Sequence, residues 1–256
     1  MNLIVSYSKF LVRSVNQHGI HSPFIYDLVT KCFYDAKEHE DYKRLKAYRL
    51  DLLNSKEVIH VTDYGAGSRI FKSPERKIRK VALNAGISLR KAKLLHRLTS
   101  YLDCKNALEL GTSVGLGSVA IATANDKIKL TTIEGCPETS SIAIKQLQKY
   151  HITNVQVLNK TFEEFLITPQ LPVFDLIYID GNHRKEPTLT YFRKLLNNVH
   201  NNSVMILDDI HWSNEMEEAW SEIKKHQKVK VSIDIFKWGI LFFREEQVKE
   251  HFTIRV

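Results

Sequence analysis

The chain has 256 residues, with 37 Lys or Arg and 29 Asp or Glu, so its formal net charge is +8. A hydrophobic fraction of 43% excludes a largely disordered chain, and only 10 Gly and 6 Pro exclude collagen-like or low-complexity sequence. The three cysteines have no CxxC spacing, which argues against a zinc site or disulfide framework and favours the reducing cytoplasm. No apolar run approaches the roughly 18 residues of a membrane span, and the first residues lack a signal-peptide pattern.

The first hundred residues have a mostly helical pattern. Helices are predicted over 3–15, 23–34, 38–55, 74–84 and 88–101, with a short strand over 58–61. The first of these helices is apolar along one face, which favours docking on the rest of the chain or in a homodimer, with membrane-surface contact as the less favoured alternative. We therefore assign residues 1–99 to a helical N-terminal extension, a candidate lid or dimerisation element.

Basic residues are concentrated between Arg69 and Arg97, where Glu75 is the only acid. Such a window is most often a solvated helix face. The alternative is attraction of an anionic substrate or of nucleic acid.

Residues 100–256 alternate between strands and helices. Strands are predicted at 106–110, 128–133, 154–158, 174–180 and 203–208, and helices at 115–125, 137–150, 161–166, 184–198 and 213–226. Apolar strands alternating with helices are typical of a parallel sheet covered on both faces. The last two predicted strands, 229–235 and 239–243, are joined by a short turn and should pair antiparallel.

A glycine-rich segment, ELGTSVG over Glu109 to Gly115, follows the first of these strands. Glycines allow a ligand to approach bare backbone, and the helix that follows offers free N–H groups. The spacing is neither that of a dinucleotide loop nor that of a P-loop, and a purely structural turn is nearly as good an explanation. Glu134 ends the next strand, where α/β nucleotide-binding folds hold ribose hydroxyls; an exposed acid before a turn is the alternative.

Acids and histidines follow the fourth and fifth strands. Asp180 is followed three residues later by His183, and Asp208 and Asp209 are followed by His211. The carboxyl ends of neighbouring strands would bring the three acids together, where they repel unless a cation or protons intervene. Carboxylate oxygens favour Mg²⁺ or Ca²⁺ over zinc. A turn at Asp180 and helix capping by the other two acids are the structural alternatives.

Together these segments make residues 100–245 resemble a class I S-adenosylmethionine-dependent methyltransferase. The resemblance implies an α/β fold with a doubly wound, seven-stranded, mostly parallel Rossmann-like sheet in the order 3-2-1-4-5-7-6. It also implies that the cofactor is S-adenosylmethionine and is bound by Glu109, Gly111, Thr112, Gly115, Glu134, Thr161, Phe162 and Asp180. The family often has an acidic residue where this chain has Thr161.

The acids after strands four and five resemble those of metal-dependent O-methyltransferases of the catechol and caffeoyl-coenzyme A type, in a branch with an Asp-Gly-x-His segment. This resemblance implies that Asp180, Asp208 and Asp209 hold Mg²⁺ or Ca²⁺. His183 stands where catechol-type enzymes carry a lysine base, and an imidazole suits proton abstraction near neutral pH. His183 could instead orient a carboxylate or stack on substrate, and His211 is the second candidate base.

The sequence and its resemblance therefore predict an enzyme that methylates an oxygen of a small hydroxylated acceptor with the help of Mg²⁺. The basic window favours an acceptor that is also anionic. An RNA-directed methyltransferase is one alternative, although no Asn-Pro-Pro-Tyr-type segment or RNA-binding module is present. A non-catalytic cofactor-binding or scaffold protein of the same fold is another. Two segments, HGIHSPF over 18–24 and DYGAGS over 63–68, have no assigned role; the two histidines of the first are more often structural than metal ligands.

Overall fold

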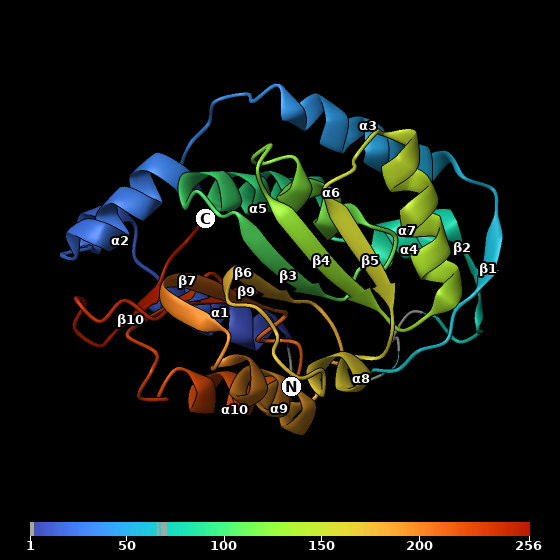
Figure 1. Ribbon diagram of the computed structural model, residues 1–256. Helices are drawn as coiled ribbons and strands as arrows, with labels where there is room; N and C mark the ends of the chain where they lie inside the picture. Colours follow the sequence, from blue (N-terminus) through green and yellow to red (C-terminus); the bar gives the residue numbers. More distant parts are fainter. Residues whose placement is uncertain (1–2, 66, 68–70) are drawn as a thin grey trace. The chain divides into compact units, whose positions relative to one another are not determined.

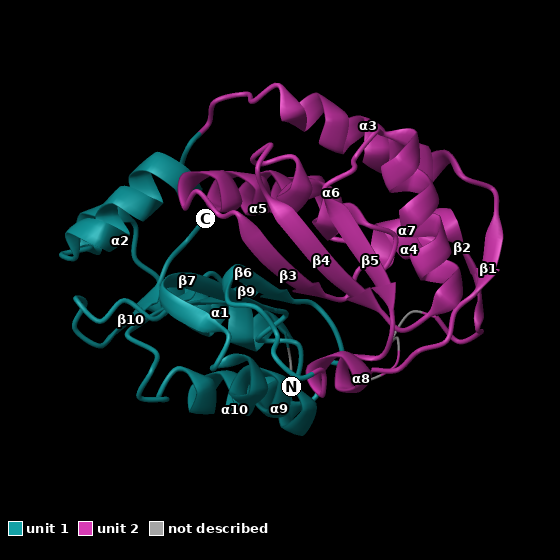
Figure 2. Ribbon diagram, in the orientation of Figure 1, with its two compact units in different colours: residues 1–35, 169–256 teal, residues 36–168 magenta. Residues whose placement is uncertain are grey.

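The computed structural model describes residues 3–65, 67 and 71–256. The chain forms two compact units, one of residues 1–35 with 169–256 and the other of residues 36–168 (Figure 2). The boundary expected at residue 100 lies inside the second unit. Residues 36–99 therefore fold together with the glycine-rich loop.

The unit of residues 36–168 is built on three parallel strands in the order β5-β4-β3 (Figure 1). They are β3 (Asn106–Leu110), β4 (Lys129–Glu134) and β5 (Val155–Asn159), each within one residue of its predicted start. The helices α6 (Leu116–Ala122), α7 (Pro137–Lys149) and α8 (Phe162–Leu166) follow them in turn. The pairing of β5 with β4 and of β4 with β3 confirms the 3-2-1 part of the expected strand order.

Before β3, the described part of the same unit contains three helices and a small antiparallel ribbon. The helices are α3 (Asp41–Asn54), α4 (Ile78–Asn84) and α5 (Leu89–Tyr101), and the ribbon pairs β1 (Val58–His60) with β2 (Glu75–Lys77). The helix predicted over 74–84 was therefore placed too early, because 75–77 pair with β1 and the helix begins only at Ile78.

In the other unit, the strand order is β10-β8-β9-β7-β6. The strands are β6 (Phe174–Ile179), β7 (Val199–Asp208), β8 (Val231–Asp234), β9 (Trp238–Phe242) and β10 (Glu250–Thr253), with helices α9 (Lys185–Leu195) and α10 (Asn214–Ile223). β6 is parallel to β7, and β9 is antiparallel to both β7 and β8. The predicted terminal hairpin and the 4-5-7-6 order are confirmed. β10 is a further strand, parallel to β8, which the sequence analysis missed.

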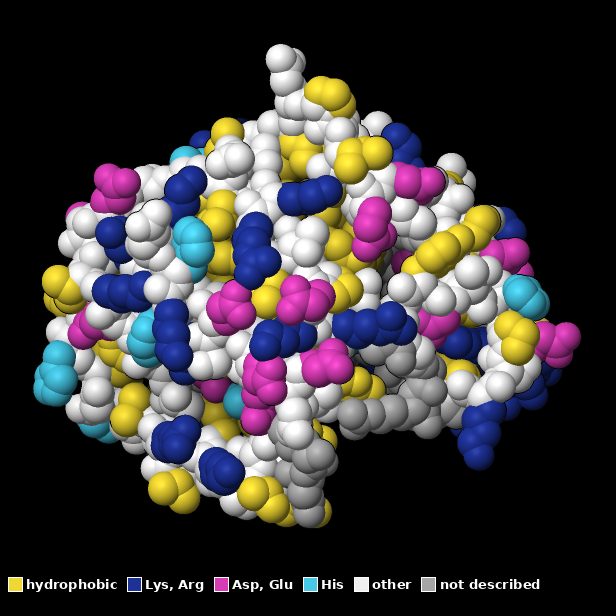
Figure 3. All heavy atoms as spheres, turned by 90° about the horizontal axis from the view of Figure 1, so that it is seen from below, with side chains coloured by type: hydrophobic (Ala, Val, Ile, Leu, Met, Phe, Trp, Pro, Cys, Tyr) yellow, Lys and Arg dark blue, Asp and Glu magenta, His cyan; other side chains and the backbone are white. Residues whose placement is uncertain are grey.

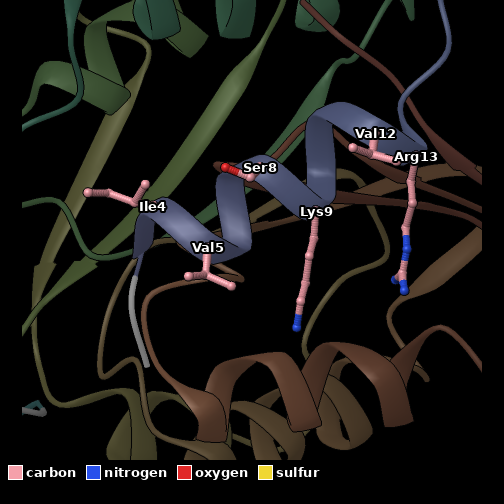
Figure 4. Close-up of a pocket in the computed structure, with 6 residues that line it drawn as sticks. All are labelled: Ile4, Val5, Ser8, Lys9, Val12 and Arg13. Carbon is pink, nitrogen blue, oxygen red and sulfur yellow. The ribbon is translucent and has the colours of Figure 1, made fainter.

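The N-terminal segment of this unit begins with α1 (Leu3–Arg13), then the 3₁₀ turn η1 (Gln17–Gly19), then α2 (Pro23–Leu28) and the π-helical turn η2 (Val29–Phe33). On α1 only Ser6 and Phe10 are buried, while Ile4 and Val12 are 74% and 88% exposed. Figure 4 shows these apolar side chains projecting from α1 beside Lys9 and Arg13. In the described part of the chain, no helix is both long and apolar enough to cross a membrane.

Candidate functional site

The carboxylate of Glu109 is buried where β3, β4 and α6 meet. Its side chain is 1% exposed, and Oε2 accepts hydrogen bonds from Ser118 Oγ at 2.5 Å and from Thr132 Oγ1 at 2.6 Å. The other oxygen, Oε1, is buried and has no hydrogen-bond partner among the described residues. A buried carboxylate oxygen without a donor is costly, so this atom marks a place where a ligand can supply the missing interaction.

Burial raises the pKa of Glu109 to about 7, even though the hydroxyls of Ser118 and Thr132 favour its charged form, and nearby Glu134 adds to the rise. Glu109 is therefore partly protonated at neutral pH in the absence of a ligand. A cationic group next to Glu109 would lower this pKa and be held by the resulting carboxylate. The chemistry of the site thus fits a positively charged ligand.

The glycine-rich loop after β3 adopts a backbone that ordinary residues rarely take. Gly111 and Gly115 have φ of 111° and 82°, and Ser113 also has a positive φ of 49°. The buried Tyr48 of α3 donates from its hydroxyl to Val114 O at 3.1 Å and lies directly against Gly115, where a Cβ would overlap it. The absence of a side chain at Gly115 therefore allows Tyr48 to pack directly on the loop, and its hydrogen bond to Val114 O fixes the loop in place.

Thr112, also predicted to bind cofactor, is 2% exposed and has its hydroxyl 2.6 Å from that of Thr132. Its side chain therefore extends the hydrogen-bonded chain that ends on Glu109. In this structure Thr112 supports the site through its hydroxyl.

Glu134 lies at the end of β4 and is joined to the glycine-rich loop. Ser113 N–H donates to its Oε2 at 2.7 Å, and Cys136 N–H donates to its Oε1 at 2.9 Å. Burial raises the pKa of Glu134, while these backbone donors act in the opposite direction. Each carboxylate oxygen can accept more than one hydrogen bond, so Glu134 keeps the capacity to accept from two neighbouring hydroxyls.

Asn159, at the end of β5, was missed by the sequence analysis. Its Nδ2 donates to the carbonyl oxygens of Glu134 at 2.7 Å and Gly135 at 3.1 Å. The β4–β5 register, which places Glu134 opposite Asn159, is the only signal that could have suggested it. Asn159 thereby fixes the turn that carries Glu134.

Thr161 and Phe162, which the resemblance places at the adenine, lie at the start of α8. Thr161 is the N-cap of α8 and forms a complete capping box with Glu164, in which its hydroxyl both accepts from Glu164 N–H and donates to the Glu164 carboxylate. Its side chain is therefore engaged in helix capping. Phe162 is the first residue of α8 and is partly buried.

In the other unit, two of the predicted acids converge on a tyrosine. The hydroxyl of buried Tyr178 lies 3.0 Å from Asp180 Oδ2 and 3.4 Å from Asp208 Oδ2. Asp208 is itself buried, and its Oδ1 accepts from Asp209 N–H at 2.8 Å. The two acids lie close together, as their positions after neighbouring strands predicted, whereas no local signal indicated the tyrosine between them.

Asp209 is held differently. It has a positive φ of 50°, its N–H also donates to Lys237 O, and its Oδ1 pairs with Lys237 Nζ at 3.5 Å. Across the described ranges, no three His, Cys, Asp or Glu side chains are arranged to hold a metal ion. The predicted trio of metal ligands is therefore assembled only as the pair Asp180 and Asp208.

His183 lies beside Asp180, in a segment where both Asn182 and His183 have positive φ. Its Nε2 is 3.7 Å from Asp180 Oδ1, and its ring lies 6.4 Å from the ring of Trp212. The side chain is 24% exposed. An imidazole that is partly accessible and next to a carboxylate has the environment of a general base.

His211, the second candidate base, has both ring nitrogens within hydrogen-bond distance of carboxylates. Its Nδ1 is 2.8 Å from Glu217 Oε1, its Nε2 is 2.9 Å from Asp234 Oδ2, and its ring stacks on Phe236. Burial lowers the pKa of His211, but the carboxylates of Asp234 and Glu217 outweigh burial and raise it overall. With both nitrogens engaged, His211 is an ion-paired cross-link between α10 and β8 and is poorly placed to accept a proton.

Several basic residues of the 69–97 window have local partners. Lys93 pairs with Glu38 at 2.8 Å, Arg76 pairs with Asp63 at 3.3 Å, and Arg97 donates to the hydroxyl of Tyr42. Arg69 lies outside the described residues. On one face of the molecule, acidic side chains also lie among basic ones (Figure 3). These pairings agree with the solvated-face interpretation of the window.

The sequence between β3 and the end of β7 matches a known family. Residues 108–210 match a family described as a methyltransferase domain. Catechol O-methyltransferase of Niastella koreensis is 31% identical over 130 residues, which are 48% of this chain and 58% of that protein. The chain thus spans a little over half the length of this curated relative.

Solved structures of methyltransferases share the fold. The S-adenosylhomocysteine-bound methyltransferase PaMTH1 of Podospora anserina gives a TM-score of 0.61 at 13% identity, over 88% of this chain and 97% of that one. TomG, an O-methyltransferase of Streptomyces achromogenes in complex with S-adenosylmethionine, gives 0.57 at 16%, over 84% and 95%. These structural similarities show the Rossmann-like methyltransferase fold that the motifs indicated.

Replacing Gly115 by Ala should destabilise the protein by about 2–4 kcal/mol, because a Cβ is disfavoured at positive φ and also overlaps Tyr48. In a Tyr48→Phe background, the overlap with the hydroxyl is removed and the cost of Gly115→Ala should fall to about 1–2 kcal/mol. Urea unfolding of the four proteins measures both values. Equal costs in the two backgrounds would show that Tyr48 does not constrain the loop.

His211→Gln should destabilise the protein by about 2 kcal/mol at pH 5.5, where the imidazolium donates to both carboxylates. Because the folded-state pKa of His211 is raised, this contribution is complete below the unfolded pKa near 6.5 and is lost as the pH rises through the folded value. The difference between wild type and variant in urea unfolding should therefore shrink towards pH 9. The exposed His18→Gln serves as control, and a difference that grows with pH would contradict this assignment.

Proposed function

We propose that this chain, whose residues 108–210 match a methyltransferase domain, transfers a methyl group from S-adenosylmethionine to an oxygen of a small hydroxylated acceptor. The observation that supports this most strongly is the buried Oε1 of Glu109, which lies close to Glu134 and has no hydrogen-bond partner among the described residues. The carboxylate of Glu109 is suited to a cationic group, and that of Glu134 is suited to a pair of hydroxyls. S-adenosylmethionine carries both kinds of group, joined through its ribose.

In this proposal, Glu134 accepts hydrogen bonds from the two ribose hydroxyls, and Glu109 faces the positively charged methionyl part. The glycine-rich loop, fixed by Tyr48 and by the Ser113–Glu134 hydrogen bond, brings its backbone close to the cofactor. When bound, the cofactor supplies a methyl group on a sulfonium sulfur, a good leaving group. The protein contributes alignment and a fixed electrostatic environment.

His183 is the proposed general base. It takes the proton of the acceptor hydroxyl, so that an oxygen lone pair becomes available for attack on the methyl carbon. The Asp180 carboxylate, 3.7 Å from Nε2, stabilises the imidazolium that forms. Trp212 offers an aromatic surface next to the imidazole, which suits a flat phenolic acceptor.

We further propose that a divalent cation such as Mg²⁺ assists. Asp180 and Asp208 would hold it, because their oxygens converge on the Tyr178 hydroxyl and two close carboxylates repel each other without a cation. Asp209, paired with Lys237, is the less suited ligand. Such a cation supplies a lowered pKa for an acceptor hydroxyl that coordinates it.

The affinity for S-adenosylmethionine should rise by at most tenfold per pH unit up to about pH 7 and then level off. This is because the pKa of Glu109 is raised to about 7 and the cationic ligand favours the ionised carboxylate. Glu109→Gln should weaken binding about 10- to 100-fold and flatten this dependence. Calorimetric titration between pH 5.5 and 8 measures both effects. The same slope in wild type and variant would exclude Glu109 as the titrating group.

Methyl transfer from methyl-labelled S-adenosylmethionine to catechols and related phenols tests the reaction itself. His183→Ala should lower kcat by about 10²- to 10⁴-fold with little change in cofactor affinity, whereas His200→Gln, at an exposed histidine of the same unit, should leave kcat unchanged. EDTA should abolish transfer, and Mg²⁺ should restore it in wild type but not in Asp180→Asn. Undiminished turnover in EDTA would remove the metal from the proposal, and undiminished turnover by His183→Ala would remove the base.

A further inference from the structure

A strap of residues 61–65, which precedes the methyltransferase domain, packs against the turn that carries Glu134. It leaves β1 with Val61 N–H donating to Pro74 O at 2.8 Å. The next residue, Thr62, donates from its N–H to Cys136 Sγ at 3.4 Å, and Cys136 also lies two residues after Glu134. Residues 63–65 of the strap are the first half of the DYGAGS segment, whose Ala66 and Ser68 lie outside the described residues.

The aromatic ring of Tyr64 occupies the space that a side chain at position 135 would fill. A Cβ built on Gly135 would lie 2.8 Å from Tyr64 Cδ2 and 3.0 Å from Cε2, closer than real Cβ atoms approach. Gly135 thus allows the ring to lie on bare backbone, one residue from Glu134. Tyr64 remains 56% exposed, so much of the ring is open to a ligand.

The strap is held in place by a cluster around Asp63. Asp63 Oδ1 accepts from Gly65 N–H at 3.1 Å, and Oδ2 accepts from Arg76 Nη2 at 3.3 Å. The Arg76 guanidinium in turn lies 4.7 Å from the centre of the Phe71 ring. From the other side, Asn159 fixes the carbonyl oxygens of Glu134 and Gly135. The strap that carries Tyr64 and the turn that carries Glu134 are therefore each held by hydrogen bonds and pack against each other.

We propose that Tyr64 is a cofactor-binding residue, whose ring stacks on the base of the nucleoside that Glu134 holds by its ribose. This inference rests on the proposed function and adds a residue from outside the matched domain. In a nucleoside, the base is attached to the sugar carbon next to the one that bears the 2′-hydroxyl. A ring beside the carboxylate that binds the hydroxyls is therefore within reach of the base. Stacking needs an open aromatic face, which the half-exposed ring provides.

Calorimetric titration of S-adenosylhomocysteine into the full chain tests this. Tyr64→Ala should weaken binding about 5- to 100-fold, while Tyr64→Phe should bind like wild type, because the ring and not the hydroxyl makes the contact. Tyr101→Ala removes another partly exposed tyrosine of the same unit and should have no effect. Wild-type affinity in Tyr64→Ala, or an equal loss in Tyr64→Phe, would overturn the inference while leaving the proposed function standing.

A spectroscopic measurement separates stacking from a structural role of the strap. In Tyr64→Trp, S-adenosylhomocysteine should quench the fluorescence of the new indole by more than it changes the fluorescence of wild type. The Kd obtained from this quenching should equal the Kd of the same variant measured by calorimetry. Absence of this additional quenching in a variant that binds the ligand would overturn the inference. If wild type itself binds no S-adenosylhomocysteine, the proposed function fails and this inference fails with it.

Discussion

The hydrogen bonds to Oε2 of Glu109 join three elements of the 36–168 unit through a single buried atom. Ser118 brings α6, Thr132 brings β4, and Glu109 itself belongs to β3. Two donors to one oxygen keep the carboxylate fixed, but burial still raises its pKa to about 7 and leaves Oε1 without a partner among the described residues. The fold therefore holds a buried carboxylate whose pKa a neighbouring cationic group would lower.

The supports of this arrangement come from outside the glycine-rich motif. Tyr48 of α3 packs against Gly115, Asn159 of β5 holds the turn after β4, and the strap with Tyr64 covers the same turn from before the domain. Residues 36–99 thus contribute directly to the environment of the loop and of Glu134. Whether or not this part of the N-terminal region also acts as the proposed lid or dimerisation element, its contacts are to the glycine-rich loop and to the turn after β4.

Most of the fold could be predicted from the sequence, because apolar runs and helical periodicity are local signals. They gave the strand β3 without error, the others within a few residues, and the terminal hairpin. Residues 75–77 and β10 were missed because their strands are short and polar, and are formed by pairing with β1 and β8. In the site, the acids were found from their positions after strands. Tyr178 between Asp180 and Asp208, and the two carboxylates that flank His211, depend on tertiary packing and have no local signature.

In the proposed function, Glu134 and the loop around it form the site for the S-adenosyl group. The most direct test is calorimetric titration of S-adenosylhomocysteine into wild type and Glu134→Ala at pH 7.5. We expect micromolar binding with one site per chain in wild type, and a loss of at least tenfold in the variant, because the ribose hydroxyls lose their acceptor. No binding by wild type, or equal binding by Glu134→Ala, would contradict the account.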